Sequence, residues 1–266
     1  MKQLQALIKQ GELISATEYA IAALKDDPAN ADVRATYIEL LCIQGALEKA
    51  DQQLDMMVRQ HPDFLVGAVN LRQLIRAASA RQDFYQAGMT ATLFSEPDAM
   101  FESLLKLRLA LKEQDLPQAV HCAGQFEANR CNTVFNLNGD TVSQLRDLDD
   151  SLGGYLELFG TDGKFYLAKF SEIDSLQLKK PESLLDTVWR RAEIVLVDGP
   201  QGEVFIPMTY NDSIKVSERL GKDTSWQQLH EHLVTGIGQK MLLAGDEAVA
   251  LSDVQLLSVA QSAELV

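Results

Sequence analysis

The sequence lacks any apolar run long enough to cross a membrane. A transmembrane helix needs about 20 consecutive apolar residues, and no stretch of the 266 residues approaches that length. The first residues, MKQLQALIKQGEL, also lack the long apolar core and the small-residue cleavage site of a signal peptide. These absences argue against a membrane or secreted protein and predict a cytoplasmic one.

Cysteine is scarce. Cys42, Cys122 and Cys131 are odd in number, scattered along the chain and never in a CxxC pair. This usage argues against a disulfide framework or a zinc ribbon. We interpret all three as reduced thiols on or near packed helices, which fits the cytoplasm.

Signatures of catalysis are missing too. There is no GxSxG, no Walker lysine loop and no GxGxxG after a strand. The pair His230-x-His232 falls in a predicted helix, where residues two apart point about 200° apart and cannot share a metal. No nucleophile stands beside a base. We therefore expect no enzyme activity, no cofactor and no metal.

One acidic stretch partly matches the sequence pattern of a calcium-binding loop. DLDDSLG carries Asp147, Asp149 and Asp150, but an EF-hand requires a glycine where Leu152 stands and a carboxylate where Leu158 stands. We interpret this stretch as a structural acidic turn, paired with Arg146 or with an arginine elsewhere.

What the chain does have is a large apolar content and an uneven charge. Apolar residues make up 46% of it, which predicts a packed core, and its length suffices for two domains. The net charge is −14: residues 1–130 carry 13 basic and 17 acidic side chains, and residues 131–266 carry 11 and 21. The excess negative charge of residues 131–266 repels the phosphate backbone of nucleic acids. This charge argues against nucleic-acid binding.

A repeat organises the first half. Gly11 and Gly45 are 34 residues apart, and the same offset relates three further pairs: Leu13 and Leu47, Ala16 and Ala50, Pro28 and Pro62. Glycine tolerates the turn between helices, alanine allows close approach, and proline ends each unit. The period resembles the tetratricopeptide repeat. QDFYQA and QDLPQA repeat its leucine-to-alanine spacing more loosely at Phe84 and Ala87, and at Leu116 and Ala119. The alternative is an ordinary helical bundle containing two similar hairpins.

The helical period predicts helices in the first half and gives way near Cys131. The expected helices span 1–10, 12–26, 32–44 with Asp32 as a cap, 46–60, 65–81, 84–94, 99–113 and 117–129.

The second half reads as hairpins. YLELFG and KFYLAKF flank an Asp162-Gly163 turn, AEIVLVDG and EVFIPMTY flank PQG, and one or two strands surround Gly245-Asp246. Two short helices are expected near 182–187 and 225–235. We predict an all-α repeat domain over 1–132 and a smaller α+β domain with a mainly antiparallel sheet over 133–266.

The second half also resembles a known family. DDSLGGYLELF, GKFYLAKF, KKPESLLDTVW, VFIPMTY, TSW and GIGQKML recur in this order in the ImpE family, whose members are also called TagJ. The family's GxLxxA-led helical half matches residues 11–62. Ser151, Leu184-Leu185-Asp186 and Met208-Thr209 depart from its pattern, each at a place where the family usually has an arginine.

The resemblance implies a non-enzymatic accessory protein of bacterial type VI secretion. Such proteins are expected to bind a helix near the N-terminus of the small subunit of the contractile sheath and to influence how the disassembly ATPase handles the sheath. The alternative is a regulator or enzyme with an unrecognised ligand site in the second half, for example among Asp147, Asp149, Asp186 and Trp189.

A partner helix would dock on the first helices of the stacked pairs. The positions twelve and eight residues before Leu47, Phe84 and Leu116 are equivalent in the repeats and share one helical face. Such a face could hold a partner helix. The predicted partner-binding residues are Ala35, Glu39, Val69, Arg72, Arg76, Phe101, Leu104 and Arg108. The alternative is that these arginines pair with local or second-domain carboxylates. Trp189 and Trp226 are both predicted to be buried and structural rather than exposed binding aromatics.

Overall fold

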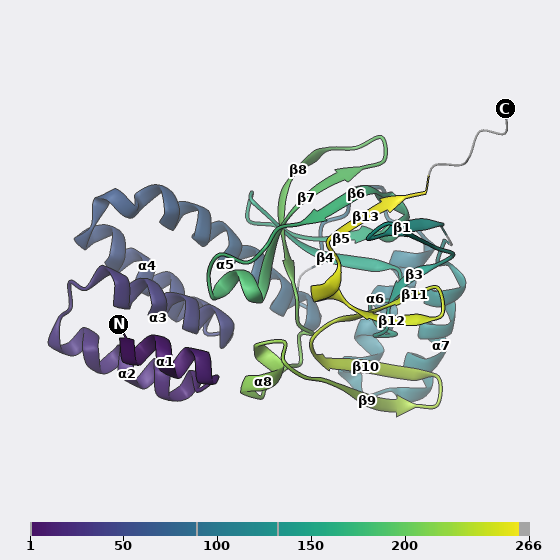
Figure 1. Cartoon of the computed structure of the whole chain (residues 1–266). Helices are drawn as coiled ribbons and strands as arrows, with labels where there is room; N and C mark the ends of the chain where they lie inside the picture. Colours follow the sequence, from purple (N-terminus) through teal and green to yellow (C-terminus); the bar gives the residue numbers. More distant parts are fainter. Residues whose placement is uncertain (1, 89, 132, 261–266) are drawn as a thin grey trace.

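The first half of the protein is a stack of helices (Figure 1). A computed structural model describes residues 2–88, 90–131 and 133–260. Its helices are α1 (Lys2–Gln10), α2 (Leu13–Asp26), α3 (Ala31–Ile43), α4 (Leu47–Gln60), α5 (Leu65–Tyr85), α6 (Ala99–Glu113) and α7 (Leu116–Ala128), with a short α8 (Val216–Arg219) in the second half.

The repeat landmarks have the roles that their residue types predict. Gly11 and Gly45 occupy the turns of the α1–α2 and α3–α4 pairs with φ of 79° and 72°, a conformation that disfavours other residues. Ala16 and Ala50 are fully buried where the helices pack. The cap of α3 is Asn30 and not the predicted Asp32, because the Asn30 side chain accepts a hydrogen bond from the Val33 amide at 3.1 Å.

The third repeat differs from the prediction. A single helix, α5, replaces the expected helices over 65–81 and 84–94, and residues 86–98 form no helix where they are described. Thr92 instead forms an isolated parallel bridge with Tyr166. Helix α5 therefore lacks the second helix that the repeat predicts. The large sheet packs against one side of its C-terminal half.

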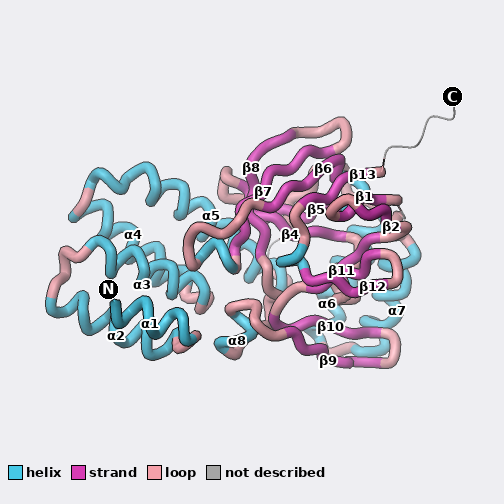
Figure 2. Tube along the Cα trace, in the orientation of Figure 1, coloured by secondary structure: helices cyan, strands magenta, loops and turns pink. Residues whose placement is uncertain are grey.

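The second half is built on an antiparallel sheet (Figure 2), as predicted. The strand order is β2-β1-β13-β6-β7-β8-β4-β5. The bounds are β1 (Phe135–Leu137), β2 (Asp140–Val142), β4 (Tyr155–Gly160), β5 (Phe165–Lys169), β6 (Ile173–Leu178), β7 (Trp189–Leu196), β8 (Gln201–Pro207) and β13 (Leu256–Val259). The predicted β4–β5 and β7–β8 hairpins are both confirmed.

Two smaller sheets accompany it. One joins β3 (Leu145–Asp147), β11 (Met241–Ala244) and β12 (Glu247–Ala250), the last two forming the hairpin predicted around Gly245-Asp246. The other is the hairpin of β9 (Thr224–His230) and β10 (Leu233–Gly238). Only a 3-10 turn, Leu185–Thr187, stands near the first predicted short helix.

The helix predicted over 225–235 was therefore wrong. The β-branched residues Val234 and Thr235 favour a strand, and Gly236 and Gly238 disfavour a helix. Gly238 has φ 88°, and a Cβ there would lie 1.9 Å from the Asp223 carbonyl oxygen. His230 and His232 consequently flank a hairpin turn, not a helical face.

Both faces of the large sheet are covered, which explains why every residue of β4 is buried. Tyr155 and Phe159 belong to the core shared with the helices. Leu156 and Leu158 point the other way, into a second core shared with the three-stranded sheet. Trp189 is buried, as predicted, but Trp226 on β9 is 42% exposed, so the prediction for Trp226 was wrong.

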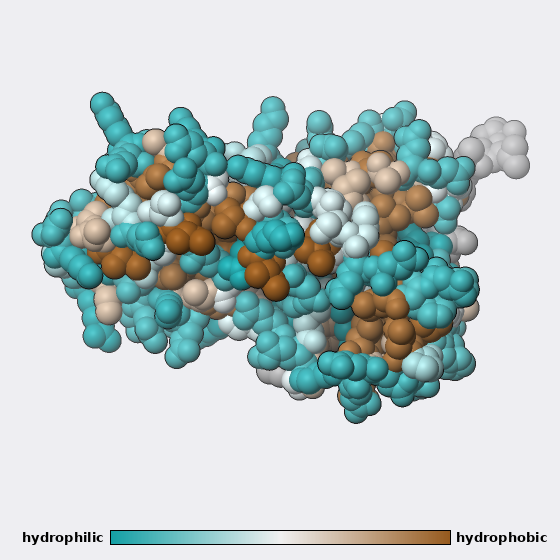
Figure 3. All heavy atoms as spheres, turned by 90° about the horizontal axis from the view of Figure 1, so that it is seen from below, coloured by the Kyte–Doolittle hydropathy of each residue, from teal (hydrophilic) through white to brown (hydrophobic). Residues whose placement is uncertain are grey.

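The division into domains 1–132 and 133–266 stays a prediction. The change from helices to strands falls between Ala128 and Phe135, but α5, α6 and α7 share one core with the sheet. Seen from below (Figure 3), the surface is mainly hydrophilic, with apolar groups gathered over each half. None of the described helices is long and apolar enough to span a membrane.

Candidate functional site

The predicted partner-binding residues lie in three different places in the structure. Ala35 and Glu39 line a small apolar groove of about 140 Å³ between α3 and α5. We call it the inner groove. Arg72 and Arg76 line a separate groove of about 490 Å³ between α4 and α5, which we call the outer groove. The one continuous face that the sequence predicted is thus divided by α5.

Glu39 is engaged within the chain. Burial raises the pKa of its carboxyl group, and the nearby backbone of Leu185 and Leu184 opposes this rise. Glu39 thus lies where α3 meets the 3-10 turn of the second half. A cavity of about 380 Å³ continues from here between α5 and the sheet, with Asp186 and Phe205 in its wall.

Arg72 is paired across the outer groove. Its Nε lies 2.5 Å from the Asp51 carboxylate, and its terminal nitrogen contacts Asp55. The hydrogen bonds to these two carboxylates raise the pKa of Arg72. Arg76, one turn later, is exposed and donates only to the Gln73 side chain, at 3.3 Å, among the contacts described. Arg76 is thus the more available cation of the two.

Three predicted residues on α6 are inaccessible. Phe101, Leu104 and Arg108 are 4%, 0% and 8% exposed, so a partner helix cannot reach them in this fold. The Arg108 guanidinium lies 4.0 Å from the centre of the Tyr85 ring and donates to the Ser151 carbonyl at 2.7 Å. The second half covers this end of the predicted face, because α6 packs directly on the sheet core.

Val69 is exposed at 46%, on the first half of α5. It extends an apolar stretch that includes Leu65 and Val66, which are 52% and 73% exposed. Sequence reasoning missed these two neighbours, although the adjacent apolar residues Leu65 and Val66 at the start of the predicted helix could have indicated them.

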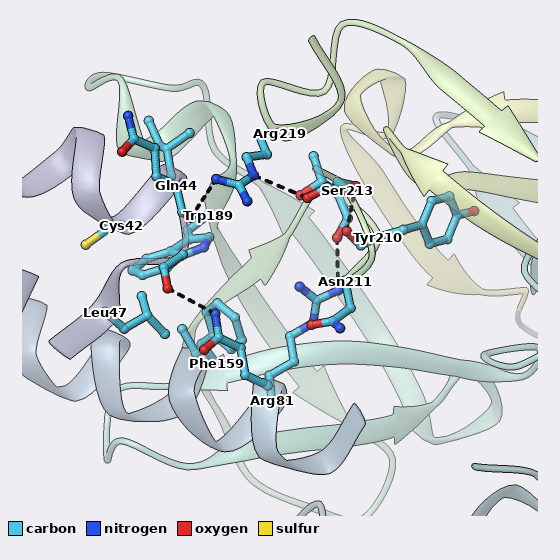
Figure 4. A pocket seen from close by; sticks show the side chains of 15 residues that line it. Cys42, Gln44, Leu47, Arg81, Phe159, Trp189, Tyr210, Asn211, Ser213 and Arg219 are labelled. Atoms are coloured by element: carbon cyan, nitrogen blue, oxygen red, sulfur yellow. Dashed lines mark hydrogen bonds between the residues drawn. The ribbon is translucent and has the colours of Figure 1, made fainter. Parts of the chain in front are cut away.

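A polar cavity of about 220 Å³ lies where the two halves meet (Figure 4). Arg219 donates to the Gln44 carbonyl at 2.7 Å and to the Ser213 carbonyl at 3.2 Å, tying the second half to the α3–α4 turn. Trp189 and Phe159 belong to the apolar part of its wall, together with Ile43, Leu47 and Ala78. Burial raises the pKa of the Cys42 thiol in the same wall, so the thiol stays protonated and is a poor nucleophile.

Beside this cavity lies a buried ionic cluster. Arg81 on α5 donates to Glu157 on β4 at 2.8 and 2.7 Å and to the Thr209 carbonyl at 2.9 Å, and Lys240 also binds Glu157. Burial alone would raise the pKa of Glu157, but the charges of Arg81 and Lys240 outweigh it and lower this pKa to about 2. The charged groups satisfy one another, which gives the cluster a structural role.

The acidic turn also has a structural role. Asp149 accepts from the Ser151 amide at 2.7 Å and from the Gly236 amide at 2.9 Å. Asp150 accepts from the Val234 amide at 2.7 Å and pairs with Arg146, as one of the predicted alternatives had it. These carboxylates hold the β9–β10 hairpin against the sheet domain. In the described part of the chain, no group of three or more His, Cys, Asp or Glu could hold a metal ion.

Comparison with known proteins gives consistent results for both halves. Residues 139–258 match the family model described as "ImpE protein", and residues 7–74 match a tetratricopeptide repeat model. The chain is 24% identical over 257 residues to the type VI secretion system accessory component TagJ of Pseudomonas aeruginosa, covering 94% of this chain and 89% of that protein. It is 38% identical to protein VPA1032 of Vibrio parahaemolyticus, whose crystal structure superposes with a TM-score of 0.95 over 99% of this chain and 100% of that one.

Proposed function

This chain belongs to the ImpE family, and on that premise we propose that it is a non-enzymatic accessory protein of a bacterial type VI secretion system. In this proposal it works in the cytoplasm. There its helical repeats bind a helix of the small subunit of the contractile sheath, and binding modulates sheath assembly or disassembly.

The observation that carries the proposal is the pair of open grooves beside α5. Helical repeats that stack in this way present extended surfaces for segments of other proteins, and helices dock in apolar grooves through residues on one face. The similarity to a protein named as a type VI secretion accessory component supports the choice of system. The mutual pairing of the buried charged groups supports a binding role over catalysis.

Calorimetric titration of the full chain with the purified sheath small subunit, and with a synthetic peptide of its N-terminal helix, tests this proposal. We expect saturable one-to-one binding of both. A peptide of the same composition in scrambled order, which cannot form the amphipathic face, is the control and should not bind. Absence of binding to both the subunit and the peptide would contradict the proposed function.

A further inference from the structure

The third repeat has a first helix without a second one. In the two preceding units, α1 pairs with α2 and α3 pairs with α4, and each second helix has 14 residues. After α5, no helix begins before Ala99 in the described residues. The stack therefore has an incomplete third unit.

The sheet covers one side of the C-terminal half of α5 and leaves the side that faces the outer groove open. On the covered side, Phe84 packs 5.6 Å from Phe165, measured between ring centres, and Arg81 binds Glu157. A stripe along the outer side of α5 stays uncovered, with residues spaced by three or four as on one helical face. This stripe consists of Leu65, Val69, Arg72 and Arg76, each exposed or half-buried.

Arg72 and Arg76 of this stripe also line the outer groove, which continues along α5 to Asp83. Its lining comes from α4 and α5 alone, with buried Leu47 and Ile75 among the lining residues. From Arg72 to Asp83 its wall on α5 extends over three helical turns, or about 16 Å. A helix of 10 to 14 residues, about 15–21 Å long, therefore matches the length of the groove.

We propose that the outer groove is the docking site of one amphipathic partner helix, which serves as the missing second helix of the third repeat. This inference rests on the proposed function, because it specifies where and how the partner helix binds. Its occupant is a helix supplied in trans and not a loop or a strand, since the position it fills is helical in the two preceding units.

The existing second helices define the chemistry of that partner. In α2 the buried positions are Leu13, Ala16 and Ala20, and in α4 they begin with Leu47, Ala50 and Leu54 and continue to Met57. Both follow an i, i+3, i+7 pattern with alanine at i+3. We therefore expect a leucine-like residue at i and a small residue at i+3 in the partner helix, because a small side chain allows the helices to approach closely.

Charges along the groove add a second requirement. Arg72 is neutralised by Asp51 and Asp55, whereas Glu48, Arg76 and Asp83 form no ion pair within the described part of the chain. A complementary partner carries an acidic residue opposite Arg76 and basic residues toward Glu48 and Asp83.

Two tryptophan substitutions distinguish the outer groove from the inner one. Ser79→Trp places a bulky ring in the outer groove, and Ala35→Trp does the same in the inner groove. The probe is the fluorescently labelled sheath-subunit helix peptide, titrated with each full-length variant after circular dichroism has checked its fold. We expect at least tenfold weaker binding by Ser79→Trp and a change of less than twofold in Ala35→Trp.

If Ser79→Trp does not fold, the double variant Glu48→Lys with Asp83→Lys tests the same groove at exposed positions, and we expect at least fivefold weaker binding. Unchanged affinity in the folded outer-groove variant would overturn the inference and leave the proposed function standing. Lost binding in Ala35→Trp would also overturn it, in favour of the inner groove or of a site spanning both. Absence of binding by the wild-type chain would instead refute the proposed function, and the inference with it.

Discussion

Arg81 of α5 and Glu157 of β4 form a two-pronged, buried ion pair, with N···O distances of 2.8 and 2.7 Å, across 76 residues of sequence. Arg81 comes from the helical stack and Glu157 from the large sheet. Their pairing joins α5, which lines both grooves, to the sheet.

Replacing one member of this pair should destabilise the whole protein. Arg81→Met leaves Glu157 buried with Lys240 as its only ionic partner among those described, and loss of one partner of a buried pair costs about 3–5 kcal/mol. Urea denaturation measures the free energy of unfolding. Arg76→Met, on the exposed side of the same helix, is the control and should change it by less than about 0.5 kcal/mol. Equal effects of the two substitutions would contradict the structural role of the pair.

The stability of the protein should depend on pH through Asp147. Burial raises the pKa of Asp147 to about 7 from an ordinary value of 3.8, with nearby Asp149 raising it further and Lys240 opposing the shift. Between these two values the folded state holds a proton that the unfolded state has lost. The contribution of Asp147 to stability is thus fully present below its unfolded pKa and is lost as pH rises through about 7.

Wild type and Asp147→Asn are compared by urea denaturation at several pH values from about 4 to 8. The difference between their free energies of unfolding measures the contribution of Asp147. The variant keeps an oxygen to accept from the Tyr210 hydroxyl but cannot titrate. We expect the wild type to lose stability relative to the variant as pH rises, by at most about 1.4 kcal/mol per pH unit for one proton. Parallel stability curves for the two proteins would show that Asp147 is ionised throughout.

The two tryptophans should differ in their contribution to stability. Trp189 is 8% exposed and packs edge-on against Phe159 at 5.4 Å between ring centres. Trp189→Ala should therefore cost about 3–5 kcal/mol. Trp226, 42% exposed, provides a matched comparison, and Trp226→Ala should cost less than about 1 kcal/mol. A loss under 1 kcal/mol for Trp189→Ala in denaturant midpoint analysis would contradict its burial in the core.

Reversing two charges in the outer groove should abolish partner binding without unfolding the chain. Arg72→Glu places a third carboxylate beside Asp51 and Asp55, and Arg76→Glu removes the exposed cation of the groove. We expect at least tenfold weaker binding of the sheath-subunit peptide by the double variant, measured by fluorescence anisotropy. Arg59→Glu, exposed on α4 outside the lining of either groove, is the matched control. Unchanged affinity in the folded double variant would move the search to another face of the repeats or to the second half.

The sequence alone determined the features that depend on near neighbours in the chain. The 34-residue period located α1 to α4, because turn glycines, packing alanines and terminal prolines act within their own helix pair. Asp162-Gly163 located the β4–β5 turn for the same reason. The family motifs likewise identified the second half, since they are runs of adjacent residues.

Only the tertiary structure decided which helical faces are covered. The pattern of α6 places Phe101, Leu104 and Arg108 on one face, but nothing local indicates that a sheet formed from residues beyond 150 buries that face. The same sheet packs against the C-terminal half of α5, and the carboxylates of Asp149 and Asp150 hold residues 224–238 as a hairpin instead of the predicted helix. Hydrophobic periodicity indicates that a helical face is apolar. Which other element of the chain buries that face depends on contacts between residues far apart in the sequence.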